Sequence, residues 1–209
     1  MDGVMPSTLA AVTTDDIGAV PHSAEPSIRR EHRNDHPAVR ALHLAAFEGD
    51  EHVPALADAL RRAEAPLAPM SFVATVEGQV AGHVLLSAGR LDAPRRIVDV
   101  LVLSPLGVLP QFQNQGIGTR LIEHALAAAD AQHAPLVFLE GSPRYYAKRG
   151  FERADTIGFR SPSLRIPPPA FQVARLAAHE PWMTGTLVYS DTFWALDCVG
   201  LRDTEASTG

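Results

Sequence analysis

A nearly continuous apolar run constrains the fold of this chain more than any other feature. Residues 97–109 contain few polar side chains and show little alternation, which predicts a central strand buried on both faces. Pro105 cannot donate a hydrogen bond to a neighbouring strand, and Gly107 weakens a strand. We therefore expect a bulged or splayed segment between Ser104 and Val108, in the second half of the strand.

The turn that follows this strand has the features of an anion-binding site. Residues 113–119 read Gln-Asn-Gln-Gly-Ile-Gly-Thr and lead into apolar residues at helical spacing, until Pro135 stops the helix. At such a turn, unpaired backbone N–H groups and the positive end of the helix point to one place, which suits phosphate. Gly116 and Gly118 would let the backbone approach the ligand closely. A Gly-x-Gly pair alone also begins many helices without binding anything.

Other motifs for phosphate binding or catalysis do not fit these residues. A P-loop needs Gly-Lys-Ser/Thr, and the only lysine, Lys148, lies elsewhere. Leu121 stands where a dinucleotide fingerprint needs a third glycine or alanine. Cys198 has no identifiable base near it in the sequence. His32 and His36 are four residues apart, but the sequence offers no further metal-ligand pattern, so we expect no metal site.

Composition narrows the class of protein. The chain has 209 residues and a net charge of −6, the profile of one globular domain and a poor match to nucleic-acid binding. No apolar run approaches the ~18 residues that cross a bilayer, and the N-terminus lacks the basic residues of a secretory signal, so we expect a cytoplasmic protein that does not bind membranes. Trp182 and Trp194 could serve a homodimer interface or cap the core.

The pattern of the chain predicts a flexible leader over residues 1–26, one folded domain over 27–202 and a flexible tail over 203–209. Inside the domain we expect both helices and strands. They are helices over 35–47, 52–62 and 117–129, a hairpin of 71–76 with 79–87, strands over 136–140 and 170–176, a short helix over 143–149 closed by Gly150, a loop over 161–169 and an aromatic tail over 182–194.

Three sequence blocks together carry a family resemblance. Residues 106–110, 113–118 and 145–151 read Leu-Gly-Val-Leu-Pro, Gln-Asn-Gln-Gly-Ile-Gly and Tyr-Tyr-Ala-Lys-Arg-Gly-Phe. Their motifs and spacing closely resemble the GNAT superfamily of acyl-CoA-dependent N-acetyltransferases, and the likeness extends over about residues 27–193. It implies an α/β GNAT fold, with a mixed, mostly antiparallel central sheet that splays in its middle and has helices on both faces.

The resemblance also implies a site for acetyl-CoA, with no metal. The pantetheine arm would insert between the central strand and the strand over 136–140, and the glycine-rich turn would bind the pyrophosphate. The cofactor-binding residues so implied are Leu106, Gly107, Val108, Gln113, Asn114, Gln115, Gly116, Ile117, Gly118 and Thr119.

Tyr146 matches the general acid of this family, which would protonate the departing thiolate. We interpret its neighbour Tyr145 as an aromatic residue packed against the sheet. For the general base Glu140 comes first, followed by His83 and Asp99, and a chain of water molecules is an equal alternative.

The implied reaction is direct transfer of an acetyl group from acetyl-CoA to a primary amine of a small molecule in a ternary complex. Two alternatives stay open. One is a non-catalytic module that senses acyl-CoA or binds a partner, and the other is an acyltransferase that acts on a protein amine.

Overall fold

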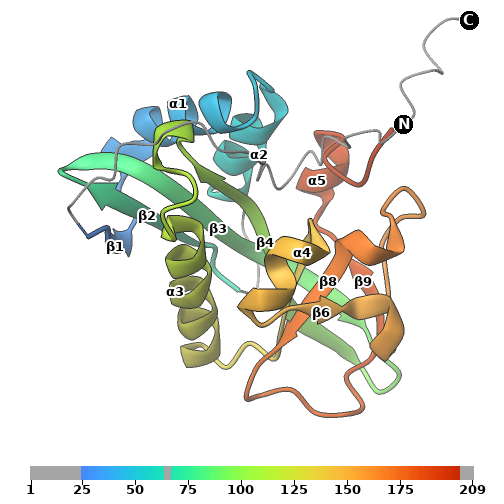
Figure 1. Ribbon diagram of the computed structural model, residues 1–209. Helices are drawn as coiled ribbons and strands as arrows, with labels where there is room; N and C mark the ends of the chain where they lie inside the picture. The colour runs from blue at the N-terminus through green and yellow to red at the C-terminus, as the bar shows by residue number, and fades with distance from the viewer. Residues whose placement is uncertain (1–24, 64–66, 203–209) are drawn as a thin grey trace, which may run out of the picture.

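The structure, a computed structural model, describes residues 25–63 and 67–202. The leader and the tail predicted from the sequence lie outside these residues, except for Glu25 and Pro26 at the end of the leader. Within the described residues, one mixed sheet of nine strands forms the centre of the molecule (Figure 1). The strands are β1 (Ser27–Arg30), β2 (Met70–Val76), β3 (Gln79–Asp92), β4 (Ile97–Val108), β5 (Leu136–Glu140), β6 (Glu152–Arg153), β7 (Phe159–Arg160), β8 (Phe171–Arg175) and β9 (Gly185–Val188).

The sheet follows the order β1-β2-β3-β4-β5-β8-β6, and β9 pairs with both β3 and β7. The β4–β5 and β7–β9 pairs are parallel. The other strand pairs of the described sheet are antiparallel. The mixed, mostly antiparallel sheet expected from the sequence is therefore confirmed.

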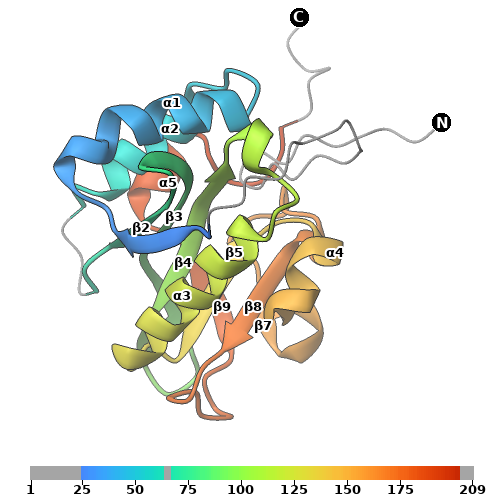
Figure 2. The ribbon, with the colours of Figure 1, turned by 60° about the vertical axis from the view of Figure 1, so that its left-hand side comes forward.

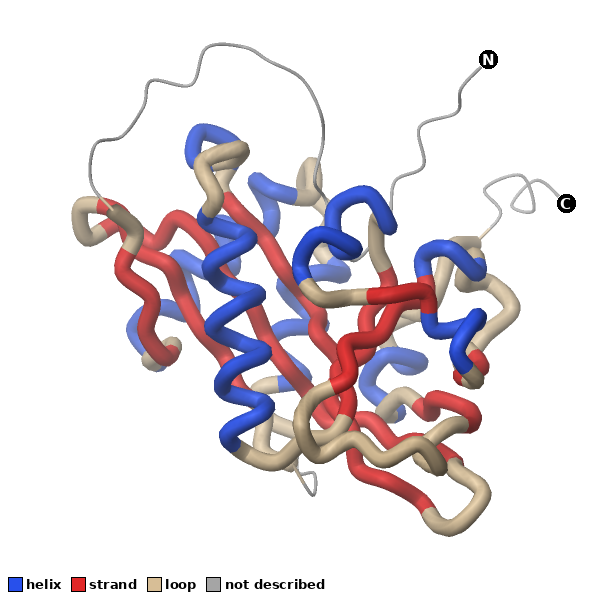
Figure 3. Tube along the Cα trace, turned by 60° about the horizontal axis from the view of Figure 1, so that its bottom comes forward, coloured by secondary structure: helices blue, strands red, loops and turns tan. Residues whose placement is uncertain are grey.

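Helices cover both faces of this sheet. Figure 2 shows α1 (His36–Ala46) and α2 (His52–Leu60) together on one face, and Figure 3 shows α3 (Ile117–Ala131) lying across the other. Each face has its own apolar core: Leu121 of α3 packs in one, and Leu56 of α2 packs in the other. The remaining helices are α4 (Pro143–Tyr146) and α5 (Asp191–Ala195), with short 3-10 turns at 33–35, 110–112, 147–149, 154–157 and 168–170.

The central strand β4 is bulged where the sequence predicts it. Val84 of β3 pairs with Leu106, but Leu86 pairs with Leu103, so one residue of β3 lies opposite Ser104 and Pro105. The peptide bond between those two residues is cis. The pairing of β4 with β5 consists of Leu101 with Val137 and Val102 with Phe138. Beyond these two pairs the strands separate, which confirms the predicted splay.

Three strands, β1, β7 and β9, were missed by the sequence patterns, and β7 has only two residues. β1 is a four-residue edge strand whose residues Arg29 and Arg30 give no apolar alternation. β9 lies in the aromatic tail, where only four residues extend and Gly185 is the first of them. Short strands of this kind are recognised by their partners across the sheet rather than by local pattern. The aromatic segment over 182–194 packs onto the rest of the domain, because Tyr189 and Phe193 are buried.

Candidate active site

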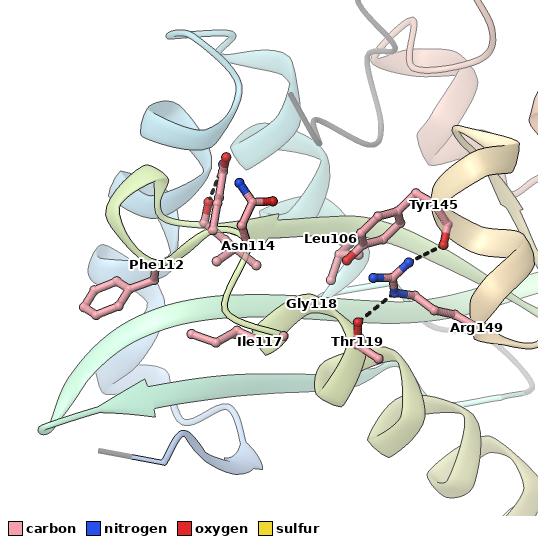
Figure 4. Close-up of a pocket in the computed structure, with 11 residues that line it drawn as sticks. Leu106, Phe112, Asn114, Ile117, Gly118, Thr119, Tyr145 and Arg149 are labelled. Atoms are coloured by element: carbon pink, nitrogen blue, oxygen red, sulfur yellow. Dashed lines mark hydrogen bonds between the residues drawn. The ribbon is translucent and has the colours of Figure 1, made fainter. Parts of the chain in front are cut away.

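A cavity of about 250 Å³ lies beside the end of β4, beyond its last pair with β5, and Figure 4 shows the residues that line it. Two stretches of the sequence surround it: residues 106–119, which run from the end of β4 into α3, and residues 145–149, in α4 and the turn after it. Of the ten cofactor-binding residues implied by the resemblance, eight line this cavity. They are Leu106, Val108, Gln113, Asn114, Gly116, Ile117, Gly118 and Thr119.

Gly107 and Gln115 do not line the cavity. The Gln115 side chain turns back and donates to the carbonyl oxygen of Gln111 at 3.0 Å. Gly107 faces α1 instead, where a Cβ atom would lie 2.9 Å from Nδ1 of His43. The absence of a side chain at residue 107 therefore allows α1 to pack closely against the sheet.

The two glycines of the turn are needed for different physical reasons. Gly116 precedes α3 with φ at +80°, a left-handed backbone conformation that residues other than glycine rarely adopt. Gly118 lies inside the first turn, where a Cβ atom would lie only 2.2 Å from the hydroxyl oxygen of Tyr145. The first backbone bond of the helix joins the N–H of Arg120 to the carbonyl of Gly116 at 3.0 Å, so the preceding N–H groups have no acceptor within the helix.

Arg149 adds a positive charge to this end of the cavity. Its Nε donates to Oγ1 of Thr119 at 2.8 Å, and its Nη1 donates to the carbonyl oxygen of Tyr145. The guanidinium carbon lies 3.6 Å from the centroid of the Tyr145 ring. Figure 4 shows the two side chains side by side over the start of α3. A fixed cation beside helix N–H groups favours an anionic ligand.

The two tyrosines of the motif occupy different places. Tyr145, which we interpreted as a packing residue, lines the cavity. Tyr146 is only 1% exposed and lies between the Tyr145 and Phe151 rings, which contact it edge-on. Burial raises the pKa of Tyr146 above its ordinary value of 10, and the neighbouring Tyr145 raises it further. The Tyr146 hydroxyl therefore keeps its proton at neutral pH, as a proton donor must before the reaction.

Glu140 ends β5 at the splay and points to the face opposite Tyr146. The Tyr189 hydroxyl donates to its Oε1 at 2.9 Å, and the backbone N–H of Gly200 donates to its Oε2 at 3.1 Å. Burial raises the pKa of Glu140 to about 7, against the smaller lowering effect of these two hydrogen bonds. A carboxyl group with this pKa can both take up and release a proton near neutral pH.

The other two candidates for the general base lie elsewhere. His83 is fully buried on β3, and both its ring nitrogens are hydrogen-bonded, to His43 at 2.8 Å and to Ser71 at 2.8 Å. Asp99 is exposed near the start of β4 and pairs across the strands with Arg90. The structure therefore brings neither of them to the cavity, and Glu140 and Tyr146 are not among the residues that line it either.

Sequence reasoning missed three residues that line the cavity. Phe112 lies in the turn just before the glycine-rich motif, and Tyr145 and Arg149 come from the next motif. The four-residue spacing of Tyr145 and Arg149 is a signal, because it places two side chains on one side of a helical turn.

The described residues contain neither a cluster of potential metal ligands nor a membrane-spanning helix. No group of three His, Cys, Asp or Glu side chains in residues 25–63 and 67–202 is arranged to hold a metal ion. The Nδ1 atom of His52 instead lies 2.9 Å from Oδ1 of a single carboxylate, Asp50, at the surface. No helix in the same residues is long and apolar enough to cross a membrane.

Comparison with known proteins gives consistent matches. The model of the acetyltransferase (GNAT) family matches residues 28–151, more than half of the chain. The chain is 30% identical over 124 residues to the uncharacterized N-acetyltransferase YjhQ of Escherichia coli, a match that covers 57% of this chain and 66% of YjhQ.

Two solved structures are similar over most of the chain. The GNAT family N-acetyltransferase YhbS of Escherichia coli, in complex with CoA, is 27% identical with a TM-score of 0.71, covering 87% of this chain and 96% of YhbS. A GNAT family acetyltransferase of Brucella melitensis, in complex with acetyl-CoA, is 28% identical with a TM-score of 0.64. This match covers 81% of the present chain and 99% of the Brucella protein. Together with the splayed sheet and the glycine-rich turn, these matches show that the chain belongs to the acetyltransferase (GNAT) family.

Proposed function

We propose that this protein transfers the acetyl group of acetyl-CoA to a primary amine of a small molecule, by direct attack in a ternary complex. The observation that carries the proposal is the cavity between the start of α3 and the splay of β4 from β5. It joins an anion-binding end to an apolar, strand-like end, which matches a ligand with phosphates at one end of a long arm.

The residues around the cavity suit acetyl-CoA. At one end, the N–H groups at the start of α3 and the Arg149 guanidinium would hold phosphate oxygens. At the other end, Leu106 and Val108 belong to the part of β4 beyond its last pair with β5, so their backbone groups can pair with amides of the pantetheine arm. When bound, acetyl-CoA supplies an acetyl group activated as a thioester.

Proton donor and proton acceptor lie on opposite faces of the sheet. Tyr146 packs in the core under α3, together with Leu139 of β5. Glu140 follows Leu139 and therefore points to the other face, where it meets Tyr189. A ligand that passes through the splay would have one group on each side.

The proposed reaction balances with these two groups. An ammonium substrate loses one proton to Glu140 and then attacks the acetyl carbon, so that a C–N bond forms and the C–S bond breaks. Tyr146 gives its proton to the departing sulfur. The nitrogen releases its second proton, which restores Tyr146, and the proton on Glu140 passes to solvent. General acid–base groups of this kind contribute about 10²–10⁴-fold to a rate.

A calorimetric titration with acetyl-CoA, with NAD and ATP as controls, tests the binding step. Selective binding of acetyl-CoA is expected, together with a rise in the thermal midpoint; at 100 times the Kd the gain in stability is about 2.7 kcal/mol. No binding at millimolar acetyl-CoA would remove both the transferase and the sensor functions.

Turnover is then measured as release of the CoA thiol with a panel of small amines. Tyr146→Phe is expected to lower kcat by about 10²-fold and to leave the Kd for acetyl-CoA within about twofold, because only the transferable proton is lost. Tyr145→Phe is the matched control, since it removes a hydroxyl from the adjacent, cavity-lining ring. If Tyr145→Phe loses turnover and Tyr146→Phe keeps it, the roles of the two residues are reversed. Acetyl-CoA binding without turnover of any amine would favour the sensor.

A further inference from the structure

A chain of four polar side chains runs through the core between α1 and the sheet, and no step of the proposed reaction uses it. Its members come from four elements: Glu31 follows β1, Ser71 is on β2, His83 on β3 and His43 on α1. We name these four residues the buried relay. Both histidines are fully buried, and the Glu31 side chain is 3% exposed.

Short distances connect the members of the buried relay. Nε2 of His43 lies 2.8 Å from Nδ1 of His83, and Nε2 of His83 lies 2.8 Å from Oγ of Ser71. The Ser71 hydroxyl donates to Oε2 of Glu31 at 2.5 Å. Arg61 of the segment after α2 donates two further hydrogen bonds to the same carboxylate, at 2.8 and 2.6 Å.

The carboxylate fixes the direction of every hydrogen bond in this chain. Burial opposes the ionisation of Glu31, but His83, Arg61 and Ser71 outweigh it and lower its pKa to about 2. Glu31 can therefore only accept, so the Ser71 proton points to it and the Ser71 oxygen accepts from Nε2 of His83. Nδ1 of His83 then carries a lone pair and accepts from Nε2 of His43. The result is one tautomer for each histidine.

The far end of the relay lies against the cofactor-binding part of β4. Nδ1 of His43 is buried and has no hydrogen-bond partner among the described residues. A Cβ atom at Gly107 would lie 2.9 Å from this nitrogen and 2.9 Å from Cδ2 of Leu42. His43 therefore occupies the space that a side chain at position 107 would take, on the face of β4 opposite the Leu106 and Val108 side chains that line the cavity.

Both imidazoles are held neutral by their surroundings. Burial lowers the pKa of His43 and of His83, and the positive charge of Arg61 lowers both further, while Glu31 acts in the opposite direction. His36 also lowers the pKa of His83. The relay needs a neutral His83, because a second proton on its Nδ1 would face the N–H of His43. A second proton on His43 would lie on Nδ1, which is buried without an acceptor among the described residues.

We propose that His43 is a positioning residue for the acetyl-CoA site. The buried relay fixes the orientation of its ring, and the ring fixes how closely β4 approaches α1 at Gly107. The proposal rests on the proposed function. It explains why residue 107 is a glycine although it does not line the cavity. It also means that Ser71, whose hydroxyl joins Glu31 to His83 on the far side of β3, acts on cofactor binding through two other side chains.

The first test uses NMR of the cofactor-free protein with ¹⁵N-labelled histidine, so it does not depend on activity. Neutral His43 and His83 are expected, each with its proton on Nε2. Addition of acetyl-CoA is expected to shift the signals of both rings and to leave the exposed His133 unchanged. A proton on Nδ1 of His43, or unchanged His43 and His83 signals at saturating acetyl-CoA, would overturn the proposal.

The second test measures the Kd for acetyl-CoA by calorimetry in variants of Ser71. Ser71→Ala is expected to weaken binding about tenfold, and Ser71→Thr, which keeps the hydroxyl, to restore it. Ser87→Ala is the matched control, because Ser87 is also a buried serine but its hydroxyl has no hydrogen-bond partner among the described residues. Equal Kd values for Ser71→Ala and the wild type would overturn the proposal. Failure of the wild type to bind acetyl-CoA would instead count against the proposed function.

A third arm separates the imidazole's hydrogen bond from its bulk. In His43→Gln the amide can still donate to His83, whereas His43→Leu fills the space without a donor. We expect His43→Gln to bind acetyl-CoA within about twofold of the wild type and His43→Leu to bind about tenfold more weakly. Similar affinities for the two variants, with both folded by circular dichroism, would contradict a role for the relay.

Discussion

Two carboxylates with buried side chains, Glu31 and Glu140, have opposite acid–base behaviour. Glu31 has a pKa lowered to about 2, and Glu140 has a pKa raised to about 7. Burial raises both values, so it does not explain the difference. The pKa of Glu31 is lowered by the adjacent His83, by two hydrogen bonds from the charged Arg61 and by one from Ser71. Glu140 accepts hydrogen bonds from the neutral Tyr189 hydroxyl and the backbone N–H of Gly200, which lower its pKa less than burial raises it. The number and charge of the neighbouring donors decide the outcome.

The difference suits the two residues to different tasks. A carboxylate that stays ionised can anchor a chain of hydrogen bonds in one direction, as Glu31 does for the buried relay. A carboxyl group that titrates near neutral pH can exchange a proton during a reaction, as the proposed function asks of Glu140. Three experiments on stability test this comparison, beginning with the largest expected effect.

Arg61→Met should have the largest effect on stability. It leaves the Glu31 carboxylate buried without its cation, and loss of one partner of a buried pair costs about 3–5 kcal/mol. The free energy of unfolding in urea measures this cost. The double variant Arg61→Met, Glu31→Gln should recover part of it, because the uncompensated charge is gone. A loss below about 1 kcal/mol in Arg61→Met would show that the cation is not what stabilises Glu31.

The pH dependence of stability should differ in sign between the two sites. The pKa of Glu140 is raised in the folded state, so its stabilising effect is complete below about 4.5 and is lost as the pH rises through about 7. Relative to Glu140→Gln, the wild type should lose about 3 kcal/mol over this range. For Glu31 the stabilising effect is present above about 4.5 and is lost as the pH falls through about 2. Urea unfolding at a series of pH values measures both, and parallel profiles for the wild type and Glu140→Gln would refute the raised pKa.

Tyr189→Phe should have the smallest effect of the three. It removes the hydroxyl that donates to Oε1 of Glu140 and keeps the ring that stacks on Phe193. The expected loss of stability is about 1–2 kcal/mol, and it should grow with pH because the hydrogen bond stabilises the ionised carboxylate. The pKa of Glu140 should rise further. An unchanged loss across the pH series would show that the hydroxyl does not distinguish the two protonation states.

Much of the fold could be predicted because its signals are local. The apolar run of β4, the breaks at Pro105 and Gly107, and the turn from Gln113 into α3 all lie within a short stretch of sequence, and the structure has each of them in its place. By contrast, β1 and β9 became visible only through their pairing with β2 and β3.

The candidate site divides in the same way. Backbone N–H groups at a helix start need only a turn of the right sequence, so the anion-binding end could be predicted from residues 113–119. The partners of Glu140 are 49 and 60 residues away in the sequence, at Tyr189 and Gly200. No local pattern reports such contacts, and the pKa of a buried group depends on them.

The sequence by itself therefore determined the sheet's central break, the glycine-rich turn and the resemblance to one family, since these depend on short stretches of backbone. The tertiary structure decided which tyrosine lines the cavity, which carboxylate titrates near neutral pH, and why residue 107 is a glycine. The reason is physical: burial, charge and close approach are set by side chains that only folding brings together, as His43 on α1 meets Gly107 on β4.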